Sequence, residues 1–194
     1  NQTEILAREL QLPHHRFAAF FQGWAGGWRR SPRRSDAGGR MAFGLATLSR
    51  LPVATWRVHP MSTPLPGVRL QAGTLRRPGS FVRFVDTSRT LLASTVVAGD
   101  GREIVVGNVH LPAERPIARH QLREVSAVLS TLPGQRILAG DLALEPGDVA
   151  AITKAASLAA GLTYPAVNPR RQVDHLLGVG VTASACGVEA LRYS

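Results

Sequence analysis

Three apolar segments of the sequence each carry polar side chains that could take part in acid–base chemistry. "EIVVGNVHLP" contains Asn108 and His110, "RILAGDLA" contains Asp141, and "RRQVDHLL" contains Asp174. Because side chains alternate along a strand, Asn108 and His110 share one face, whereas His175 falls on the face opposite Asp174 and is expected to lie in the core. Burying a carboxylate costs on the order of several kcal/mol unless a cation, a metal or hydrogen-bond donors compensate it. Two such aspartates therefore indicate a functional site.

Each of these residues also has an ordinary structural interpretation. Asp141 could be the N-cap of a following helix or a turn residue, and His110 could be a structural histidine. Asp174 could form an ion pair with Arg170 or Arg171. The other histidines lie in no acidic or metal-binding spacing, and no role is expected for His14, His15, His59 and His120.

The spacing of apolar residues places these side chains in a domain of mixed α and β structure. A helix is expected over 3–11, with Ile5, Leu6, Leu10 and Leu12 on one face. Strands are expected at 16–21, 41–49, 53–60, 90–98 and 103–111, with a turn at "RLP" and a hairpin turn at "GDG". Then follow a helix over 113–131, a buried strand at "RILAG", a helix over 147–160 and a final pair of strands from "QVDHLLGVG" onward. The three tryptophans are expected to be packing residues: Trp24, Trp28 and Trp56.

Size and composition favour one globular domain over residues 1–194. The chain has 194 residues, of which 44% are hydrophobic, and no stretch approaches the roughly 20 apolar residues of a membrane span. Its first residues, "NQTEILAREL", are typical of an amphipathic helix and not of a signal peptide. Cys186 is the single cysteine, so an internal disulfide is excluded and a reducing compartment is favoured. We therefore expect a cytoplasmic location.

Positive charge is concentrated in the first half of the sequence. Residues 1–89 carry 14 Arg against 4 acidic residues, whereas residues 90–194 carry 8 Arg and 1 Lys against 9 acidic residues, so the net charge of +10 belongs to the first part. This asymmetry favours an anionic partner such as nucleic acid, with the segment 28–40, "WRRSPRRSDAGGR", as the contact. The alternative is a solvated loop in a chain whose richness in Arg, Ala and Gly reflects genomic composition.

The order of the polar motifs adds a resemblance. "GLATLSRLPV", "VVGNVHLP", "ILAGDLALEP" and "TYPAVNPRRQVDHLL" occur in the order found in the endonuclease/exonuclease/phosphatase family. This family of metal-dependent hydrolases includes pancreatic-type deoxyribonuclease, abasic-site endonucleases, inositol polyphosphate phosphatases and sphingomyelinases. The resemblance covers nearly the whole chain. It implies a four-layered α/β sandwich, in which two packed, mostly antiparallel β-sheets are flanked by helices.

The resemblance also implies a function and roles for the candidate residues. The chain is expected to hydrolyse phosphate esters with Mg²⁺ or Mn²⁺, as a phosphodiesterase, nuclease or phosphatase. His110, supported by Asn108, matches the histidine that binds the scissile phosphate and acts as general acid. Asp141 matches the aspartate that activates water and contributes to the metal site. Asp174 matches the carboxylate that holds a second catalytic histidine in its working tautomer.

The sequence departs from the family pattern in three places. Ala143 stands where the family has an asparagine, two residues after the motif aspartate, that supports the transition state, and a methyl group cannot donate a hydrogen bond. The family's N-terminal strands, with their metal-binding glutamate, would precede residue 1, and its "SDH" strand would follow the final "LRYS". We therefore expect an incomplete domain that lacks those terminal strands and has impaired activity. The alternatives are a non-catalytic homologue that binds anions or nucleic acid through its Arg-rich half, and a lipid phosphodiesterase that uses the loop 23–28.

Overall fold

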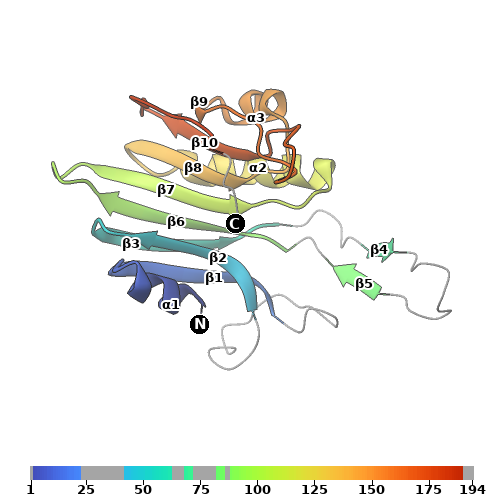
Figure 1. Ribbon diagram of the computed structural model, residues 1–194, viewed down its shortest axis with the longest axis horizontal. Coiled ribbons are helices and arrows are strands. Elements are labelled where there is room, and N and C mark those ends of the chain that lie inside the picture. The colour runs from blue at the N-terminus through green and yellow to red at the C-terminus, as the bar shows by residue number, and fades with distance from the viewer. Residues whose placement is uncertain (1, 23–41, 63–67, 72–81, 86–87, 190–194) are drawn as a thin grey trace.

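A six-stranded β-sheet forms the middle of the fold and carries the candidate residues. The computed structural model describes residues 2–22, 42–62, 68–71, 82–85 and 88–189. The strand order of the large sheet is β3-β6-β7-β8-β10-β9 (Figure 1). Its strands are β3 (Val53–Pro60), β6 (Thr90–Val97), β7 (Glu103–His110), β8 (Gln135–Asp141), β9 (Ala156–Ala159) and β10 (Asp174–Val179). All neighbours are antiparallel except β7 and β8, which are parallel.

Two helices cover one face of this sheet. The parallel pair β7–β8 requires a crossover, which is the helix α2 (Arg115–Ser130). The helix α3 (Pro146–Thr153) follows β8 and packs beside α2. Proline at the first turn of both helices fits the positions where a backbone N–H has no helical partner.

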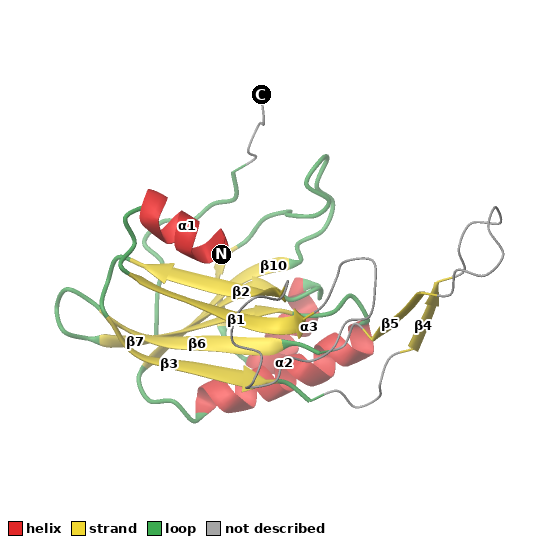
Figure 2. Cartoon of the chain, turned by 90° about the horizontal axis from the view of Figure 1, so that it is seen from below, coloured by secondary structure: helices red, strands yellow, loops and turns green. Residues whose placement is uncertain are grey.

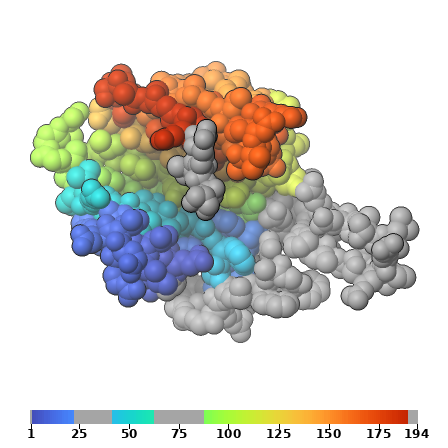
Figure 3. Space-filling model, in the orientation of Figure 1, coloured from blue at the N-terminus to red at the C-terminus, as the bar shows by residue number. Residues whose placement is uncertain are grey.

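A second, two-stranded sheet packs on the opposite face. β1 (His14–Gln22) and β2 (Ala42–Ser49) are antiparallel, and α1 (Gln2–Glu9) packs on β1. A further antiparallel ribbon joins β4 (Val68–Gln71) and β5 (Val82–Val85) and extends to one side in Figure 1. Figure 2 shows the layers in order: α1, the β1–β2 sheet, the large sheet, and then α2 with α3. In Figure 3 the N-terminal residues (blue) and the C-terminal residues (orange to red) lie on opposite sides of the molecule. This is the α/β sandwich that the sequence predicted.

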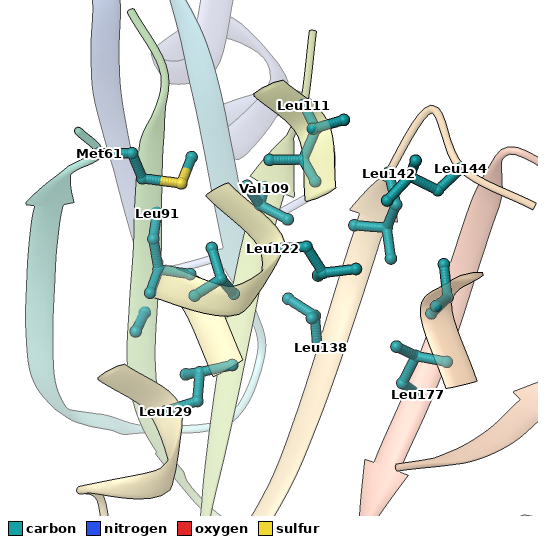
Figure 4. Packing of buried hydrophobic residues seen from close by; sticks show 14 of the residues in the cluster. Met61, Leu91, Val109, Leu111, Leu122, Leu129, Leu138, Leu142, Leu144 and Leu177 are labelled. Carbon is teal, nitrogen blue, oxygen red and sulfur yellow. The ribbon is translucent and has the colours of Figure 1, made fainter. Parts of the chain in front are cut away.

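The main hydrophobic core lies between the large sheet and α2. Residues 118, 122, 125 and 129 of α2 recur at helical spacing and are buried against Leu91, Leu138 and Leu177 of the sheet (Figure 4). Each fully buried leucine contributes about 1.5–3 kcal/mol of transfer free energy, so this layer fixes the sheet that positions the site. A smaller cluster between the two sheets contains Leu45 and Leu92, with Trp56 packed on it, which confirms the packing role expected for that tryptophan.

Several element predictions are confirmed. The predicted helix over 3–11 is α1, that over 113–131 is α2, and "RILAG" belongs to β8. The "GDG" hairpin joins β6 to β7, where Gly101 has a φ of 82°, a left-handed conformation that glycine tolerates. The turn at "RLP" connects β2 to β3, but these strands do not pair, because the chain passes there from the small sheet to the large one.

Three element predictions are wrong. The helix predicted over 147–160 ends at Thr153, because Lys154 adopts a left-handed conformation (φ 54°) and the next residues form β9 beside β10. Residues 181–189 form no regular structure, although a strand was expected there. Ile5 and Leu6 of α1 are 52% and 50% exposed; the smaller Thr3 and Ala7 are buried instead. Among the described residues, no helix is long and apolar enough to cross a membrane.

Candidate active site

Strand register brings three of the predicted site residues into one row. His110, the last residue of β7, lies opposite Asp141, the last residue of β8. Asp141 in turn lies opposite Asp174, the first residue of β10. Neighbouring strands are about 4.8 Å apart, and directly paired residues present their side chains on the same face of a sheet. An imidazole and two carboxylates therefore lie on one face of the large sheet, at neighbouring strand ends.

That face looks toward the β1–β2 sheet and away from α2. The alternate residues Val109 and Leu138 point into the α2 core, which places their neighbours on the other side. His175, next to Asp174, is 5% exposed, and its Nε2 lies 2.9 Å from the Leu144 carbonyl oxygen. The expectation that His175 belongs to the core is thus confirmed.

His110 and Asp141 are close enough to interact through charge. The Nε2 atom of His110 lies 3.8 Å from Oδ2 of Asp141, and their side chains are 51% and 36% exposed. The other carboxylate oxygen, Oδ1, accepts a hydrogen bond of 2.8 Å from the backbone N–H of Ala143. Because the turn holds Oδ1, the carboxylate is fixed with Oδ2 toward the imidazole. Water and a phosphate group can therefore reach this pair from solvent.

The argument from buried carboxylates is therefore wrong for these positions. Each of the three strands contains buried residues, but His110 and Asp174 are exposed, since they occupy the strand ends, where the sheet meets solvent. Among the described residues, Asp174 forms an ion pair with neither Arg170 nor Arg171, the two partners that the sequence suggested. Arg171 donates from Nε to Oε1 of Glu145 at 2.5 Å instead.

Asn108 joins the two sheets. Its Nδ2 donates to the Ala46 carbonyl oxygen at 3.0 Å and lies 3.3 Å from the Thr47 hydroxyl, both on β2. It shares a face with His110, as predicted. Its amide hydrogens are directed to β2, however, so in this conformation Asn108 fixes the spacing between the sheets next to the site.

An aromatic and cationic cluster behind His110 was not found from the sequence. The Phe20 ring meets the His110 imidazole edge-on, with centroids 6.3 Å apart. The guanidinium of Arg89 lies 5.2 Å from the Phe20 centroid and 5.3 Å from that of Phe21, and Arg89 is only 6% exposed. These contacts join β1 to the start of β6 and depend on tertiary structure; "RFAAFF" by itself indicated only an apolar strand.

A hollow of about 220 Å³ adjoins Asp141. It is lined by Ala113, Asp141, Ala143, Tyr164, Arg171 and Val173. Ala143 has a φ of 52°, a left-handed conformation that asparagine and glycine adopt more readily than alanine. Tyr164 and Arg171 belong to the "TYPAVNPRRQVDHLL" motif, but their spacing gave no sign that they would face Asp141.

Few side chains at the candidate site could ligate a metal ion. Within the part of the chain that the structure describes, no three His, Cys, Asp or Glu side chains are grouped to hold a metal ion. Mg²⁺ is commonly held by one or two carboxylates together with waters and substrate phosphates. Asp141 alone does not complete such a site.

The α/β sandwich that carries this site belongs to a known class of fold. The chain has the fold of the endonuclease/exonuclease/phosphatase proteins, as the sequence resemblance predicted. A solved endonuclease/exonuclease/phosphatase from Beutenbergia cavernae matches with 21% identity and a TM-score of 0.56, over 92% of this chain and 50% of that one. The chain thus spans half the length of that structure. By sequence alone, no family model and no curated protein matches.

Two further structures share the fold. A mannosyl-6-phosphatase from Bacteroides thetaiotaomicron matches with 13% identity and a TM-score of 0.64, over 99% of this chain and 72% of that one. The beta toxin of Staphylococcus aureus, solved as a mutant with bound magnesium ions, matches with 14% identity and a TM-score of 0.52, over 70% of this chain and 52% of that one. At these identities the matches establish the fold.

Proposed function

We propose that this chain hydrolyses phosphate esters at the row formed by His110, Asp141 and Asp174. The observation that carries the proposal is the pairing of His110 with Asp141 at one edge of this fold, with the Nε2 and Oδ2 atoms 3.8 Å apart. The fold is shared with a mannosyl-6-phosphatase and with endonuclease/exonuclease/phosphatase proteins, which supports the same class of chemistry.

Asp141 is suited to activate water. Its Oδ1 is held by the Ala143 N–H, and the free Oδ2 can accept a proton from a water molecule. The water oxygen then bonds to phosphorus while the bond from phosphorus to the leaving oxygen breaks. The protonated His110 imidazole contacts the phosphate and transfers its proton to the leaving oxygen. One residue gains a proton and the other loses one, so the step balances.

Asp174 adds a second carboxylate beside Asp141. The resemblance predicts that it holds a second catalytic histidine. Its neighbour His175 cannot be that residue, because it is buried on the other face of the sheet. We propose that Asp174 raises the negative potential at this end of the strands.

The proposed hydrolysis is expected to use a divalent cation. Mg²⁺ or Mn²⁺ would neutralise charge on the phosphate, and the beta toxin neighbour was solved with magnesium. Asp141 is the candidate ligand, but the described residues do not supply the further protein ligands of a complete metal site. The proposed proton transfers use His110 and Asp141 alone.

The test is hydrolysis of bis(p-nitrophenyl) phosphate by the purified chain, with and without Mg²⁺. We expect slow turnover, because Ala143 offers no side-chain donor to the transition state. His110→Gln and Asp141→Asn should each lower that rate by about a hundredfold or more, to the detection limit. His15→Gln, which changes an exposed histidine of β1, is the matched control and should leave the rate unchanged. Equal rates in all four proteins would contradict the proposal.

Ala143 also supports a second candidate, a non-catalytic phosphate-binding protein. If the wild-type chain binds inorganic phosphate through His110 yet neither it nor Ala143→Asn hydrolyses the ester, this candidate is favoured. The Arg-rich segment 28–40 and the loop 23–28, which were predicted to contact nucleic acid or lipid, lie outside the described residues.

A further inference from the structure

A second hollow, of about 210 Å³, lies between the C-terminal ends of α2 and α3, over the strands β8 and β10. We call it the α2–α3 hollow. Leu138 and Leu177 line it and belong to the core beneath α2, so it lies on the helix-covered face of the large sheet. Arg136 and Val179 also line it and are paired at the ends of β8 and β10 opposite to Asp141 and Asp174. The hollow is therefore separate from the candidate active site.

The hollow exists because α3 is half as long as α2. The two helices have 8 and 16 residues, and they begin side by side, since Asp148 in the first turn of α3 pairs with Arg115 in the first turn of α2. At about 1.5 Å per residue, α3 ends roughly 12 Å before α2 does. Among the described elements, no other helix covers the sheet beside the second half of α2.

The floor of the α2–α3 hollow is apolar. Leu129 and Leu138 are each 6% exposed and Leu177 is 3% exposed, and all three are labelled in Figure 4 as part of the main core. Val179, at 37% exposure, extends this surface toward solvent. A volume of about 210 Å³ is below the range of about 300–1,000 Å³ for drug-sized ligands. The floor therefore suits a compact apolar group such as a single ring.

Two cationic side chains line the same hollow. Arg136 donates from Nη1 to the Leu132 carbonyl oxygen at 3.0 Å, at the end of α2. Within the part of the chain that the structure describes, neither Arg136 nor Lys154 forms an ion pair. The other N–H groups of the guanidinium and the Lys154 ammonium can thus donate to a ligand. Charged donors of this kind bind carboxylates strongly.

Lys154 is unusual in two respects. It is the single lysine of a sequence that has 22 arginines. It is also the C-cap of α3, with a φ of 54°, a left-handed conformation that glycine and asparagine adopt more readily. Backbone strain at a charged residue beside a hollow is typical of a functional position.

We propose that the α2–α3 hollow binds a small aryl monocarboxylate. Its ring lies on the leucine floor, and its carboxylate accepts hydrogen bonds from Arg136 and Lys154. A monoanion is favoured over a phosphate dianion, because the carbonyl oxygens at the C-terminal ends of both helices carry partial negative charge. The site goes beyond the proposed function and does not depend on it.

Three probes separate the contributions of ring and charge. We would titrate 3-phenylpropionate, 3-phenylpropanol and acetate into the purified chain and follow the amide chemical shifts by NMR. The alcohol has the same ring without the charge, and acetate has the charge without the ring. 3-Phenylpropionate should bind at least about tenfold more tightly than either, with shifts concentrated at 126–130, 136–138 and 153–155.

Two variants locate the ligand within the hollow. Lys154→Gln should weaken binding of 3-phenylpropionate by about tenfold and leave that of 3-phenylpropanol unchanged. Ser126→Leu, which places a larger side chain in the wall, should abolish binding of both. Arg123→Gln removes an exposed arginine of α2 that does not line the hollow and is the control for net charge. Lys154 is exposed, so its replacement is expected to fold even if Ser126→Leu does not.

Several outcomes would overturn the inference. These are equal affinity for 3-phenylpropionate and 3-phenylpropanol, unchanged affinity in Lys154→Gln, and an equal loss in Arg123→Gln. Tighter binding of benzyl phosphate than of 3-phenylpropionate would also overturn it, since the hollow would then be a phosphate site. His110→Gln should leave the affinity unchanged, and a loss there would place the carboxylate at the candidate active site instead. Ester hydrolysis by the chain, present or absent, does not alter any of these results.

Discussion

Position 143 shows how backbone conformation and chemistry meet at a single residue. Ala143 has a left-handed backbone conformation and donates its N–H to Asp141. It also borders the hollow beside Asp141. A left-handed conformation costs an L-residue with a Cβ about 1–2 kcal/mol, and less for asparagine, whose side chain can hydrogen-bond locally. The asparagine that the family resemblance predicts here would therefore fit the backbone as well as supply a donor.

Replacing Ala143 separates these two effects. Ala143→Gly should raise the free energy of unfolding by about 1 kcal/mol, because glycine relieves the left-handed strain, without changing ester hydrolysis. Ala143→Asn should also be more stable than alanine, and should increase turnover by tenfold or more, since one transition-state donor is commonly worth about 100–1,000-fold. Urea unfolding and bis(p-nitrophenyl) phosphate hydrolysis measure the two effects. An equal gain in turnover for both variants would show that the donor has no part in it.

At the scale of single residues, the sequence predicted the row but not its surroundings. The order of the motifs was sufficient to assign His110 and Asp141 to one site, because the family resemblance supplied a strand pairing that the local pattern alone does not contain. The exposure of that pair was missed because a motif does not say where a strand ends. Phe20, Tyr164 and Arg171 were missed because their contacts join segments distant in sequence.

At the scale of elements, the errors arise where tertiary pairing competes with local preference. Residues 156–159, "ASLA", contain good helix formers, yet they form β9 because β10 offers a strand to pair with. In α1 the apolar spacing predicted the wrong face. The small Thr3 and Ala7 allow the helix to approach β1, and Ile5 and Leu6 remain exposed.

An acidic side chain of α2 holds the segment that follows β3. Glu124 accepts hydrogen bonds from His59 Nε2 at 2.8 Å and from the Ser62 backbone at 3.0 Å. His120 contributes through the Ser62 hydroxyl at 3.1 Å, so two of the four histidines to which the sequence gave no role lie in one polar cluster. Partial burial alone would raise the pKa of Glu124, but the hydrogen bonds from Ser62 and His59 outweigh it and hold the pKa below its usual value.

This lowered pKa predicts how stability depends on pH. Because the folded-state pKa lies below the unfolded value of about 4.3, the contribution of Glu124 is complete above that value and is lost as pH falls through the folded pKa. Glu124→Gln should cost on the order of 1 kcal/mol at pH 7 and flatten the acid limb of the stability curve. Urea unfolding between pH 3 and pH 7 checks this. Glu103→Gln, at an exposed position on β7, is the control, and an equally steep acid limb in Glu124→Gln would contradict the assignment.

At the scale of the whole molecule, the net positive charge and the candidate site belong to different parts of the sequence. The large sheet with α2 and α3 is built mostly from residues after 89, whose charges cancel, whereas residues 1–89 carry the whole net charge of +10. The candidate site lies mainly on the neutral part. The positive charge that could attract a polyanion therefore lies mainly outside the residues of the candidate site.

Salt dependence tests whether this charge acts through a defined segment. If the segment 28–40 contacts a polynucleotide, the logarithm of the affinity should fall with the logarithm of salt concentration by about 0.9 per duplex phosphate neutralised. Replacing four arginines together should flatten that slope by up to about four contacts: Arg29, Arg30, Arg33 and Arg34. Fluorescence anisotropy with labelled duplex DNA at several salt concentrations measures it.

A matched variant distinguishes position from net charge. It removes four exposed arginines that lie elsewhere on the described structure: Arg16, Arg50, Arg57 and Arg123. Both quadruple variants lower the net charge equally, so an effect of overall charge alone would change both slopes alike. We expect a larger change for the segment 28–40, since contiguous guanidinium groups can follow neighbouring phosphates. Equal changes would assign the basic half of the chain to non-specific attraction, and unchanged slopes in both would remove nucleic acid as a partner of this surface.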